Sequence, residues 1–488
     1  MAQTATIITF IVYLIFLLGV GFYFYKKTSN IEDYLLGGRG MGKWVTALSA
    51  QASDMSGWLL MGLPGAVFLS GVSQSWIAIG LFIGTLLNWI LVAPRLRVYT
   101  EKTNSLTMAS FLEERFKDPT GLLRVICAII TLIFFAVYAS SGMAGAGKLF
   151  ESMFGLDYKL AVIIGCVVIV LYTMLGGFMA VCWTDLFQGI LMFISIVVVP
   201  IAALKGVGGF KSINTALIAK GISTSMVNGA GMGAFLAIIS SAAWGIGYFG
   251  QPHILVRFMS IKSVKEVSSS TIIAIIWVII SLTGAIFVGL IGTAMYATPP
   301  GGDSEKVFIY MIADLFNPWI GGILLAAILS AIMSTIDSQL LVSSSALTED
   351  FYQKVIKKDA SEKELIIVGR ICVIIISVIA MLLALKPDNS ILGLVSYAWG
   401  GFGAAFGPVI LMALFSKKTS WKSALGGMIA GAVVLVLWKQ IGLGSVMYEI
   451  VPGFIANFIC MFIINAIVKQ DDAEMDRIFD EVVSETKN

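Results

Sequence analysis

The sequence is poor in charge and in histidine. Of its 488 residues only 12% are Asp, Glu, Lys or Arg, and there is a single histidine, His253. A soluble protein of this length carries about twice that share of charge, so the composition argues against a soluble protein. One histidine excludes a His-rich metal cluster. The formal net charge of +3 is too small to indicate a nucleic-acid partner.

Cysteine is also scarce. The five cysteines are scattered, and no two of them form a CxxC pair: Cys127, Cys166, Cys182, Cys372 and Cys460. This spacing indicates neither a metal site nor a disulfide framework. We also find no nucleophile beside a general base, so the sequence does not predict an enzyme.

Long apolar runs are what the sequence has in abundance, and 58% of its residues are hydrophobic. About 20 helical residues cross a lipid bilayer. We therefore predict an all-α polytopic membrane protein with about 13 transmembrane helices. The expected spans are 7–25, 45–69, 74–94, 123–152, 160–179, 184–204, 232–250, 271–296, 319–347, 365–385, 391–415, 422–440 and 446–468.

The distribution of basic residues predicts the orientation. If the N-terminus is outside, about 24 of the 32 Lys and Arg residues fall in segments on the inner side, Arg257 among them. The positive-inside rule therefore favours a multi-pass protein of the cell (inner) membrane with the N-terminus outside. Residues 1–468 would form the transmembrane domain, and the polar segment 469–488 a cytoplasmic tail.

Two expected spans are interrupted by small and polar residues. They contain "SAQASDMSGWLLMG" (49–62) and "SSAAWGIGYFGQPH" (240–253), and they lie five helices apart. Such matching interruptions indicate a transporter built from inverted repeats. Residues 45–204 and 232–415 would be the repeats, and spans 7–25, 422–440 and 446–468 would be additions.

Asp54 lies inside the first interrupted span. A charge at the middle of a bilayer costs roughly 2.5–3.5 kcal/mol, so Asp54 either serves an ion pathway or caps the half-helix that follows. A break here frees the carbonyls of Ala52 and Met55, which suit a cation such as Na⁺. It also frees N–H groups around Ser56 and Trp58, which suit a carboxylate.

A second set of oxygens lies in "ILSAIMSTIDSQLL" (328–341). Ser334 and Thr335 follow Ala331 by three and four residues, so both hydroxyls lie over its carbonyl. With the carbonyls of Ala52 and Met55 they would form a cage of five uncharged oxygen ligands. Alternatively, the two hydroxyls bond back to their own helix or join neighbouring helices.

Two further acids have two interpretations each. Asp185 opens the expected sixth span and either belongs to the ion pathway or stabilises a helix N-terminus. Asp337 lies one turn beyond Thr335 and either lines the inner exit or pairs with a lysine.

Aromatic residues gather in the second interrupted span. Trp244 and Tyr248 are four residues apart and share a helix face. With Trp58 and Tyr138 they would enclose a small apolar ring, although core packing explains such residues as well. We expect Pro252 and His253 to end a helix.

Seven segments resemble the sodium:solute symporter family over about residues 7–468. They are "DYLLGGRGMG", "TALSAQASDMSGWLLMGLPGAVFLSG", "GGFMAVCWTDLFQG", "WGIGYFGQPHILVRFM", "NPWIGGILLAAILSAIMST", "SSSALTEDFY" and "LGLVSYAWGGFGAAFGP". The two long blocks that contain the interruptions are closer to the proline carriers of the family than to its sugar, iodide and pantothenate branches.

The resemblance implies a LeuT-type fold with 5+5 inverted repeats and discontinuous spans 2 and 7. It implies alternating-access uptake of L-proline with one Na⁺, the alternative being another small solute or proton coupling. The family's sodium ligands fall on Ala52, Met55, Ala331, Ser334 and Thr335. Its sodium pathway includes Asp54 and Asp185, and an arginine tied to Na⁺ dependence matches Arg39. Its proline contacts fall on Ser56, Gly57, Trp58, Tyr138, Trp244, Tyr248 and Pro252.

Overall fold

The computed structural model describes residues 4–25, 31–173, 177–386, 390–468 and 470–486. Parts of the expected fifth span and of the tail, residues 174–176, 469 and 487–488, lie outside the described residues. Within the described ranges the regular structure is helical, and the one pairing of extended backbone is an isolated bridge between Met41 and Ile261. The prediction of an all-α protein is confirmed.

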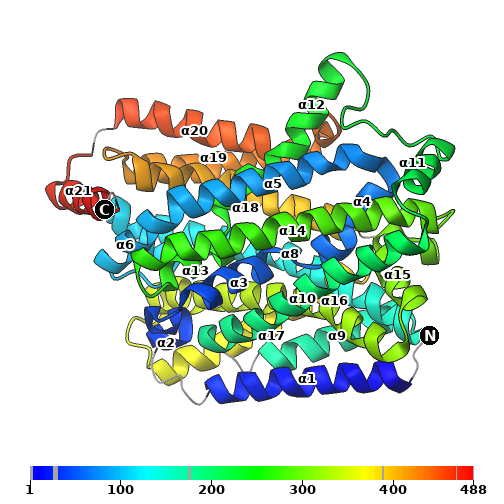
Figure 1. Ribbon diagram of the computed structural model, residues 1–488. Coiled ribbons are helices and arrows are strands. Elements are labelled where there is room, and N and C mark those ends of the chain that lie inside the picture. Colours follow the sequence, from blue (N-terminus) through cyan, green and yellow to red (C-terminus); the bar gives the residue numbers. More distant parts are fainter. Residues whose placement is uncertain (1–3, 26–30, 174–176, 387–389, 469, 487–488) are drawn as a thin grey trace.

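The helices lie side by side, mostly along one common direction, and the two chain ends lie at opposite ends of the bundle (Figure 1). The α-helices are α1 (Thr4–Tyr25), α2 (Ile31–Leu36), α3 (Lys43–Asp54), α4 (Leu63–Ser70), α5 (Ser75–Leu87), α6 (Ala93–Lys102), α7 (Met108–Phe116), α8 (Leu122–Phe154), α9 (Tyr158–Thr173), α10 (Phe178–Gly206), α11 (Phe210–Ala219), α12 (Gly231–Ala242), α13 (Pro252–Ser260), α14 (Val267–Met295), α15 (Val307–Leu315), α16 (Pro318–Ser345), α17 (Glu362–Ala384), α18 (Ile391–Phe415), α19 (Trp421–Gln440), α20 (Ile450–Ile467) and α21 (Ala473–Glu485). Three π-helical segments, η2 (Trp58–Gly62), η4 (Asn88–Val92) and η9 (Ala346–Ile356), and the 3₁₀ segment η5 (Ala243–Gly250) continue neighbouring helices.

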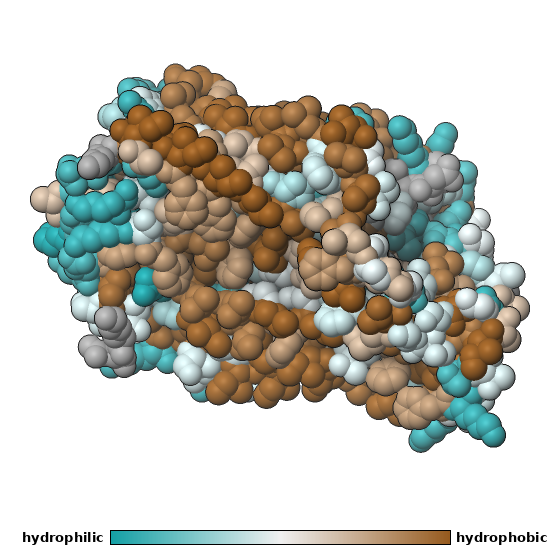
Figure 2. All heavy atoms as spheres, turned by 90° about the horizontal axis from the view of Figure 1, so that it is seen from above, coloured by the Kyte–Doolittle hydropathy of each residue, from teal (hydrophilic) through white to brown (hydrophobic). Residues whose placement is uncertain are grey.

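The surface is that of a membrane protein. Hydrophobic side chains cover its middle, and hydrophilic side chains gather at the two ends (Figure 2). Large apolar side chains such as Ile15, Ile133 and Ile272 are exposed, as lipid-facing side chains are. Eleven helical stretches among the described residues are long and apolar enough to cross a bilayer.

The number of spans differs from 13 for two reasons. The eleven stretches include Trp58–Lys102 as one, which contains parts of two expected spans, 45–69 and 74–94, although the backbone leaves the helical region between them at Gly71, with φ 73° and ψ −152°. The expected span 160–179 corresponds to α9, whose apolar part is shorter than the others. The exact number 13 therefore stays a prediction.

The first expected interruption is present. Helix α3 ends at Asp54, and the next residue, Met55, leaves the helical region with φ −86° and ψ 77°. The chain resumes as η2 at Trp58 and then as α4. Only Met55, Ser56 and Gly57 therefore separate the two halves of this span.

The second expected interruption is also present, inside the expected segment 240–253. Helix α12 passes into the 3₁₀ segment η5, and Gln251 is extended, with φ −84° and ψ 105°. Pro252 then begins α13, so the expectation that Pro252 and His253 end a helix is wrong. Proline suits the first turn of a helix, where its missing N–H has no partner in any case.

Glycines allow η5 to lie close to two helices. A Cβ on Gly84 of α5 would lie 2.1 Å from the Gly245 carbonyl oxygen, and a Cβ on Gly403 of α18 would lie 2.8 Å from the Gly247 Cα. Backbone therefore contacts backbone on both sides of η5, which only glycine permits at such distances. Within the glycine-rich stretch Gly400–Pro408, it is Gly403 that makes this contact.

Candidate functional site

Four oxygens of the expected cage lie together between α3 and α16. The Ser334 hydroxyl donates to the Ala52 carbonyl at 2.7 Å, and the Thr335 hydroxyl approaches the same oxygen at 3.4 Å. Both hydroxyls also lie over the Ala331 carbonyl, at 3.3 and 3.1 Å. Bonding back to the helix and joining neighbouring helices therefore occur together. Met55 lies at the break, and its place as a fifth ligand stays a prediction.

Asp54 joins the two interrupted spans. The Tyr248 hydroxyl donates to Asp54 Oδ2 at 2.5 Å, and Asp54 is completely buried. The Asp54 carbonyl accepts from Trp58 Nε1 at 3.0 Å and from the Tyr138 hydroxyl at 3.4 Å. The Asp54 side chain does not cap the following half-helix, because no side chain caps the start of η2. The Asp54 carboxylate accepts from Tyr248 instead.

Three of the four expected aromatic residues, Trp58, Trp244 and Tyr248, form one buried cluster with two additional members, whereas the Tyr138 ring lies edge-on to His253 at 5.8 Å. The ring centroids of Trp58 and Trp244 are 6.2 Å apart. Trp399 of α18 lies edge-on to Tyr248 at 4.9 Å, and Tyr448 lies 5.7 Å from Trp244. Neither Trp399 nor Tyr448 was predicted, since both lie in distant spans. A tryptophan beside the glycine-rich stretch of α18 was the available signal for Trp399.

Asp185 lies in a buried ion pair with Arg257. Arg257 Nη2 is 3.2 Å from Asp185 Oδ2, and neither side chain is exposed. Ser49 donates to the same carboxylate oxygen at 2.6 Å. Arg257 also donates to Ser338 at 2.5 Å, and Ser338 in turn donates to the Ser334 carbonyl at 2.7 Å. A continuous set of contacts therefore runs from this ion pair to the oxygen cage.

Two expectations about these charges are wrong. Asp185 is the eighth residue of α10, because that helix begins at Phe178 and not near residue 184. It therefore cannot act as an acid at the helix start. Arg257 is not a cation of an inner loop but a buried residue of α13, and apolar neighbours on both sides in "HILVRFM" were the signal for its depth.

The remaining predicted residues lie beside this core. Asp337 is buried and interacts electrostatically with Asp185 and Arg257. Pro252 lines a narrow cavity with hydrophobic residues such as Phe178, and no residue of the ring cluster lines it. Arg39 donates to the carbonyls of Thr100, Ser105 and Met259, so it ties the start of the first broken span to α6 and α13.

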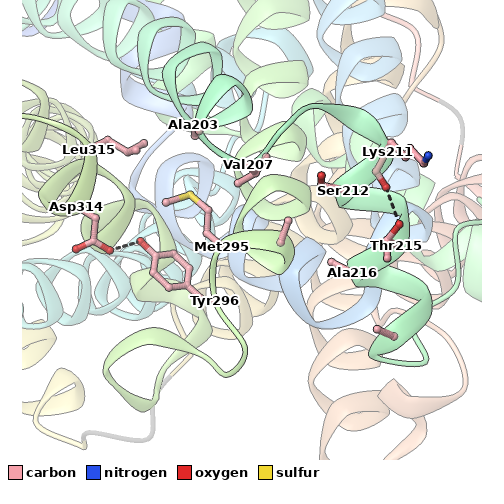
Figure 3. A pocket seen from close by; sticks show the side chains of 13 residues that line it. Ala203, Val207, Lys211, Ser212, Thr215, Ala216, Met295, Tyr296, Asp314 and Leu315 are labelled. Carbon is pink, nitrogen blue, oxygen red and sulfur yellow. Dashed lines mark hydrogen bonds between the residues drawn. The ribbon is translucent and has the colours of Figure 1, made fainter.

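A cavity of about 690 Å³ lies elsewhere, between the ends of α10, α11, α14 and α15 (Figure 3). Its polar groups bond to each other: the Tyr296 hydroxyl donates to Asp314 at 2.8 Å, and the Thr215 hydroxyl donates to the Lys211 carbonyl at 3.0 Å. These groups do not converge on one point, so the oxygen cage and the ring cluster form the better candidate site.

The fold and the site define a class of protein. Two interrupted helices meet inside a bundle of membrane spans and bring carbonyl and hydroxyl oxygens beside an aromatic cluster, which is the arrangement of a secondary transporter. A model of the sodium:solute symporter family matches residues 34–431. The chain belongs to this family.

Curated relatives match almost the whole chain. It is 48% identical to the sodium/proline symporter of Escherichia coli (strain K12), covering 98% of this chain and 96% of that protein. It is 50% identical to the high-affinity proline transporter PutP of Bacillus subtilis (strain 168), covering 92% of this chain and 95% of that protein.

A solved structure shares the fold. A Na⁺-coupled sialic acid symporter in a substrate-bound, outward-open state aligns with a TM-score of 0.82 and 20% identity, covering 96% of this chain and 99% of the other. The nucleobase-cation symporter Mhp1 aligns with a TM-score of 0.58. The fold is therefore of the LeuT type, as the resemblance implied.

Proposed function

We propose that this protein takes up L-proline together with Na⁺ by alternating access across the bacterial inner membrane. The observation that carries the proposal is the meeting of the two interrupted spans at Asp54 and Tyr248, with the oxygen cage on one side and the aromatic cluster on the other. The relatives described above are named for proline transport, which supports the choice of amino acid.

The sodium half of the site is the cage between α3 and α16. Na⁺ takes oxygen ligands, and the carbonyls of Ala52 and Ala331 with the hydroxyls of Ser334 and Thr335 provide four of them. Met55 provides the fifth in this proposal. None of these ligands is charged, so the bound ion keeps its charge and the membrane potential drives it inward at about 2.3 kcal/mol per 100 mV.

The proline half lies on the other side of the break. The substrate carboxylate binds N–H groups that the break leaves free near Ser56, Gly57 and Trp58. Its pyrrolidine ring packs against aromatic side chains, which give affinity through buried apolar area. The remaining proposed contacts are Tyr138, Trp244, Tyr248 and, at the restart of the second span, Pro252.

Asp54 and Asp185 define the proposed ion route. Asp54 lies beside the cage, and Asp185 is connected to it through Arg257, Ser338 and Ser334. Ser338 is one turn further along α16 than Ser334, toward the end of the molecule where the C-terminal helix α21 lies. With the N-terminus outside and α21 in the cytoplasm, Asp185 is on the exit side of the cage.

The repeat organisation belongs to the same proposal. Residues 45–204 and 232–415 are the two inverted repeats of the transmembrane domain, and 7–25, 422–440 and 446–468 are additional spans. Each repeat contributes one interrupted helix. Rocking of the elements that carry these helices against the others would expose the site to one side of the membrane at a time.

The test is uptake of radiolabelled proline by the purified full-length protein in proteoliposomes. We expect saturable uptake that requires an inward Na⁺ gradient and increases when the interior is made negative. Liposomes without protein, and proteoliposomes with K⁺ replacing Na⁺ at equal ionic strength, are the controls.

Two results would contradict the proposal. Uptake that follows a pH gradient and ignores Na⁺ would assign proton coupling instead. Na⁺-dependent uptake of another amino acid or of a sugar, with no uptake of proline itself, would assign a different solute.

A further inference from the structure

Trp399 is the one member of the aromatic cluster that comes from α18. It is 1% exposed, and its ring centroid is 4.9 Å from that of Tyr248 at an interplanar angle of 88°. The hydrogens at the edge of one ring therefore face the π-surface of the other, which is a favoured aromatic geometry. Trp399 thus contacts the residue that donates to Asp54.

The Trp399 indole also fits a gap in the backbone of η5. A Cβ on Gly247 would lie 2.0 Å from Trp399 Nε1, so the ring occupies space that any other residue at 247 would fill. From this position Nε1 donates to the Trp244 carbonyl at 2.8 Å. One indole therefore holds the backbone at Trp244 and the ring at Tyr248.

A neighbouring side chain fixes Trp399 in turn. Gln251, the extended residue of the second break, donates from Nε2 to the Trp399 carbonyl at 3.1 Å and to the Gly247 carbonyl at 3.0 Å. Gln251 is fully buried. The second break is therefore attached to α18 by two hydrogen bonds that involve Trp399, one through its indole and one through its carbonyl.

We propose that Trp399 is a positioning residue for the proline site: it holds Trp244 and Tyr248 where the substrate ring packs. This inference rests on the proposed function, since it assigns those two side chains to proline. Trp399 acts through them, without contact to the oxygen cage between α3 and α16. Its removal should weaken proline binding much more than sodium binding.

The test compares Trp399→Phe with Trp277→Phe in proteoliposomes. Phenylalanine keeps a ring but loses the N–H. Trp277 is the matched control because it is also buried and also donates to a carbonyl, that of Gly189 at 3.1 Å, outside the aromatic cluster. We expect Trp399→Phe to raise the KM for proline about five- to tenfold, the effect of one lost hydrogen bond. The Na⁺ half-saturation at saturating proline should change less than about twofold, and Trp277→Phe should leave the KM for proline unchanged.

A second measurement, of stabilisation by proline, applies to a variant whose transport is too slow for its KM to be determined. Proline should raise the thermal unfolding temperature of the wild type and of Trp277→Phe in Na⁺, and raise that of Trp399→Phe much less. Combining Trp399→Phe with Tyr248→Phe should raise KM by less than the product of the single effects, because the two rings contact each other.

The outcomes separate this inference from the proposed function. If the wild type takes up proline with Na⁺ but Trp399→Phe has an unchanged KM and an unchanged stabilisation by proline, Trp399 has no positioning role. Equal changes in both tryptophan variants would show a general packing effect and overturn the inference too. Absence of Na⁺-dependent proline uptake in the wild type would overturn the proposed function itself.

Discussion

Single side chains connect the two halves of the site. Asp54 accepts a 2.5 Å hydrogen bond from Tyr248, and Ser334 donates to the carbonyl of Ala52, two residues before Asp54. A cation that drew Ser334 toward itself would change the surroundings of the same short segment that faces the aromatic cluster. Coupling between ion and solute therefore requires no distant relay.

Thr335→Ala tests the cage at the residue scale. Loss of one oxygen ligand should raise the Na⁺ concentration for half-maximal uptake by about tenfold, equivalent to about 1.4 kcal/mol. Protein abundance should change little. The measurement is proline uptake as a function of Na⁺ concentration in proteoliposomes.

Thr348→Ala is the matched control for Thr335→Ala. Thr348 lies in η9, which continues the same helix, and its hydroxyl bonds back to Ser344 at 2.7 Å, within that helical run. Its removal should leave Na⁺ activation unchanged. Unchanged activation in Thr335→Ala as well would remove that hydroxyl from the cation site.

Residue types and spacing predicted which side chains matter, but not their partners. The hydroxyls of Ser334 and Thr335 were predictable because helix geometry alone places them over Ala331. The contact of Tyr248 with Asp54 joins residues 194 positions apart and depends on the packing of two helices. The pairing of Arg257 with Asp185 was missed for the same reason, since a charge count treats every arginine near a span end as a loop residue.

At the scale of elements, the 3₁₀ segment η5 is held between α5 and α18. Gly80 and Gly84 of α5 face the carbonyls of Ala242 and Gly245, and a Cβ on either glycine would lie 2.1 Å from the oxygen it faces. The backbone around η5 therefore packs directly against the backbone of α5. The position of the second break is therefore fixed by its neighbours as much as by its own residues.

Gly84→Ala tests this packing. The added methyl group should displace η5 and destabilise the protein by about 1–3 kcal/mol, as overpacking does in a dense core. We expect a lower thermal unfolding temperature in detergent and a loss of proline uptake. The assay is thermal unfolding followed by tryptophan fluorescence.

Gly233→Ala is the control for Gly84→Ala. Gly233 lies in α12, the helix that continues into η5, and no atom lies within 4 Å of the position that its Cβ would take. This variant should be as stable as the wild type or slightly more so, because alanine favours a helix. Similar behaviour of the two alanine variants would contradict the close packing of η5 on α5.

Helix periodicity predicted the long elements and failed at the irregular ones. The expected span 123–152 corresponds to α8, Leu122–Phe154, because one apolar run fills one helix. The second break lies inside the expected segment 240–253, but the helix start at Pro252 was missed because proline signals equally an end and a start, and only the extended Gln251 before it decides between them.

At the scale of the whole molecule, the C-terminal helix α21 fastens separate elements together. It lies beside α6 at the end of the bundle where the C-terminus is found (Figure 1). Glu481 pairs with Lys102 at 2.9 Å, and Lys418 pairs with Asp471 at 2.7 Å and with Asp476 at 2.9 Å. Its apolar face is buried, with Met475 and Val482 each 1% exposed. Residues Ala473–Glu485 of the expected polar tail thus form a docked helix.

Lys418→Glu should weaken this docking. We expect the unfolding temperature to fall by about 2 °C at low salt and the difference to vanish near 1 M salt, because exposed ion pairs are screened there. Lys422→Glu is the matched control, since Lys422 lies four residues further, at the start of α19, and its ammonium group faces the ring of Trp421. A difference between Lys418→Glu and wild type that persists at high salt would contradict an electrostatic attachment.

The docking of α21 should also depend on pH. Hydrogen bonds from Lys102 and then Arg477 lower the pKa of Glu481 below its ordinary value of 4.5. A lowered carboxyl pKa stabilises the folded state above the ordinary value, and this contribution is lost as the pH falls through the lowered pKa. The effect of Lys418→Glu should therefore be measured at neutral pH, where Glu481 is ionised and its ion pair with Lys102 contributes in full to the docking of α21.

The most direct test of the account is the equilibrium binding of proline to the purified protein at different Na⁺ concentrations, with K⁺ keeping the ionic strength constant. If the cage and the aromatic cluster form one site, the Kd for proline should fall at least about tenfold as Na⁺ rises. Proline should lower the Kd for Na⁺ by the same factor, because linkage is reciprocal. A Kd for proline that is the same in Na⁺ and in K⁺ would contradict the claim that the two interrupted helices bind both solutes together.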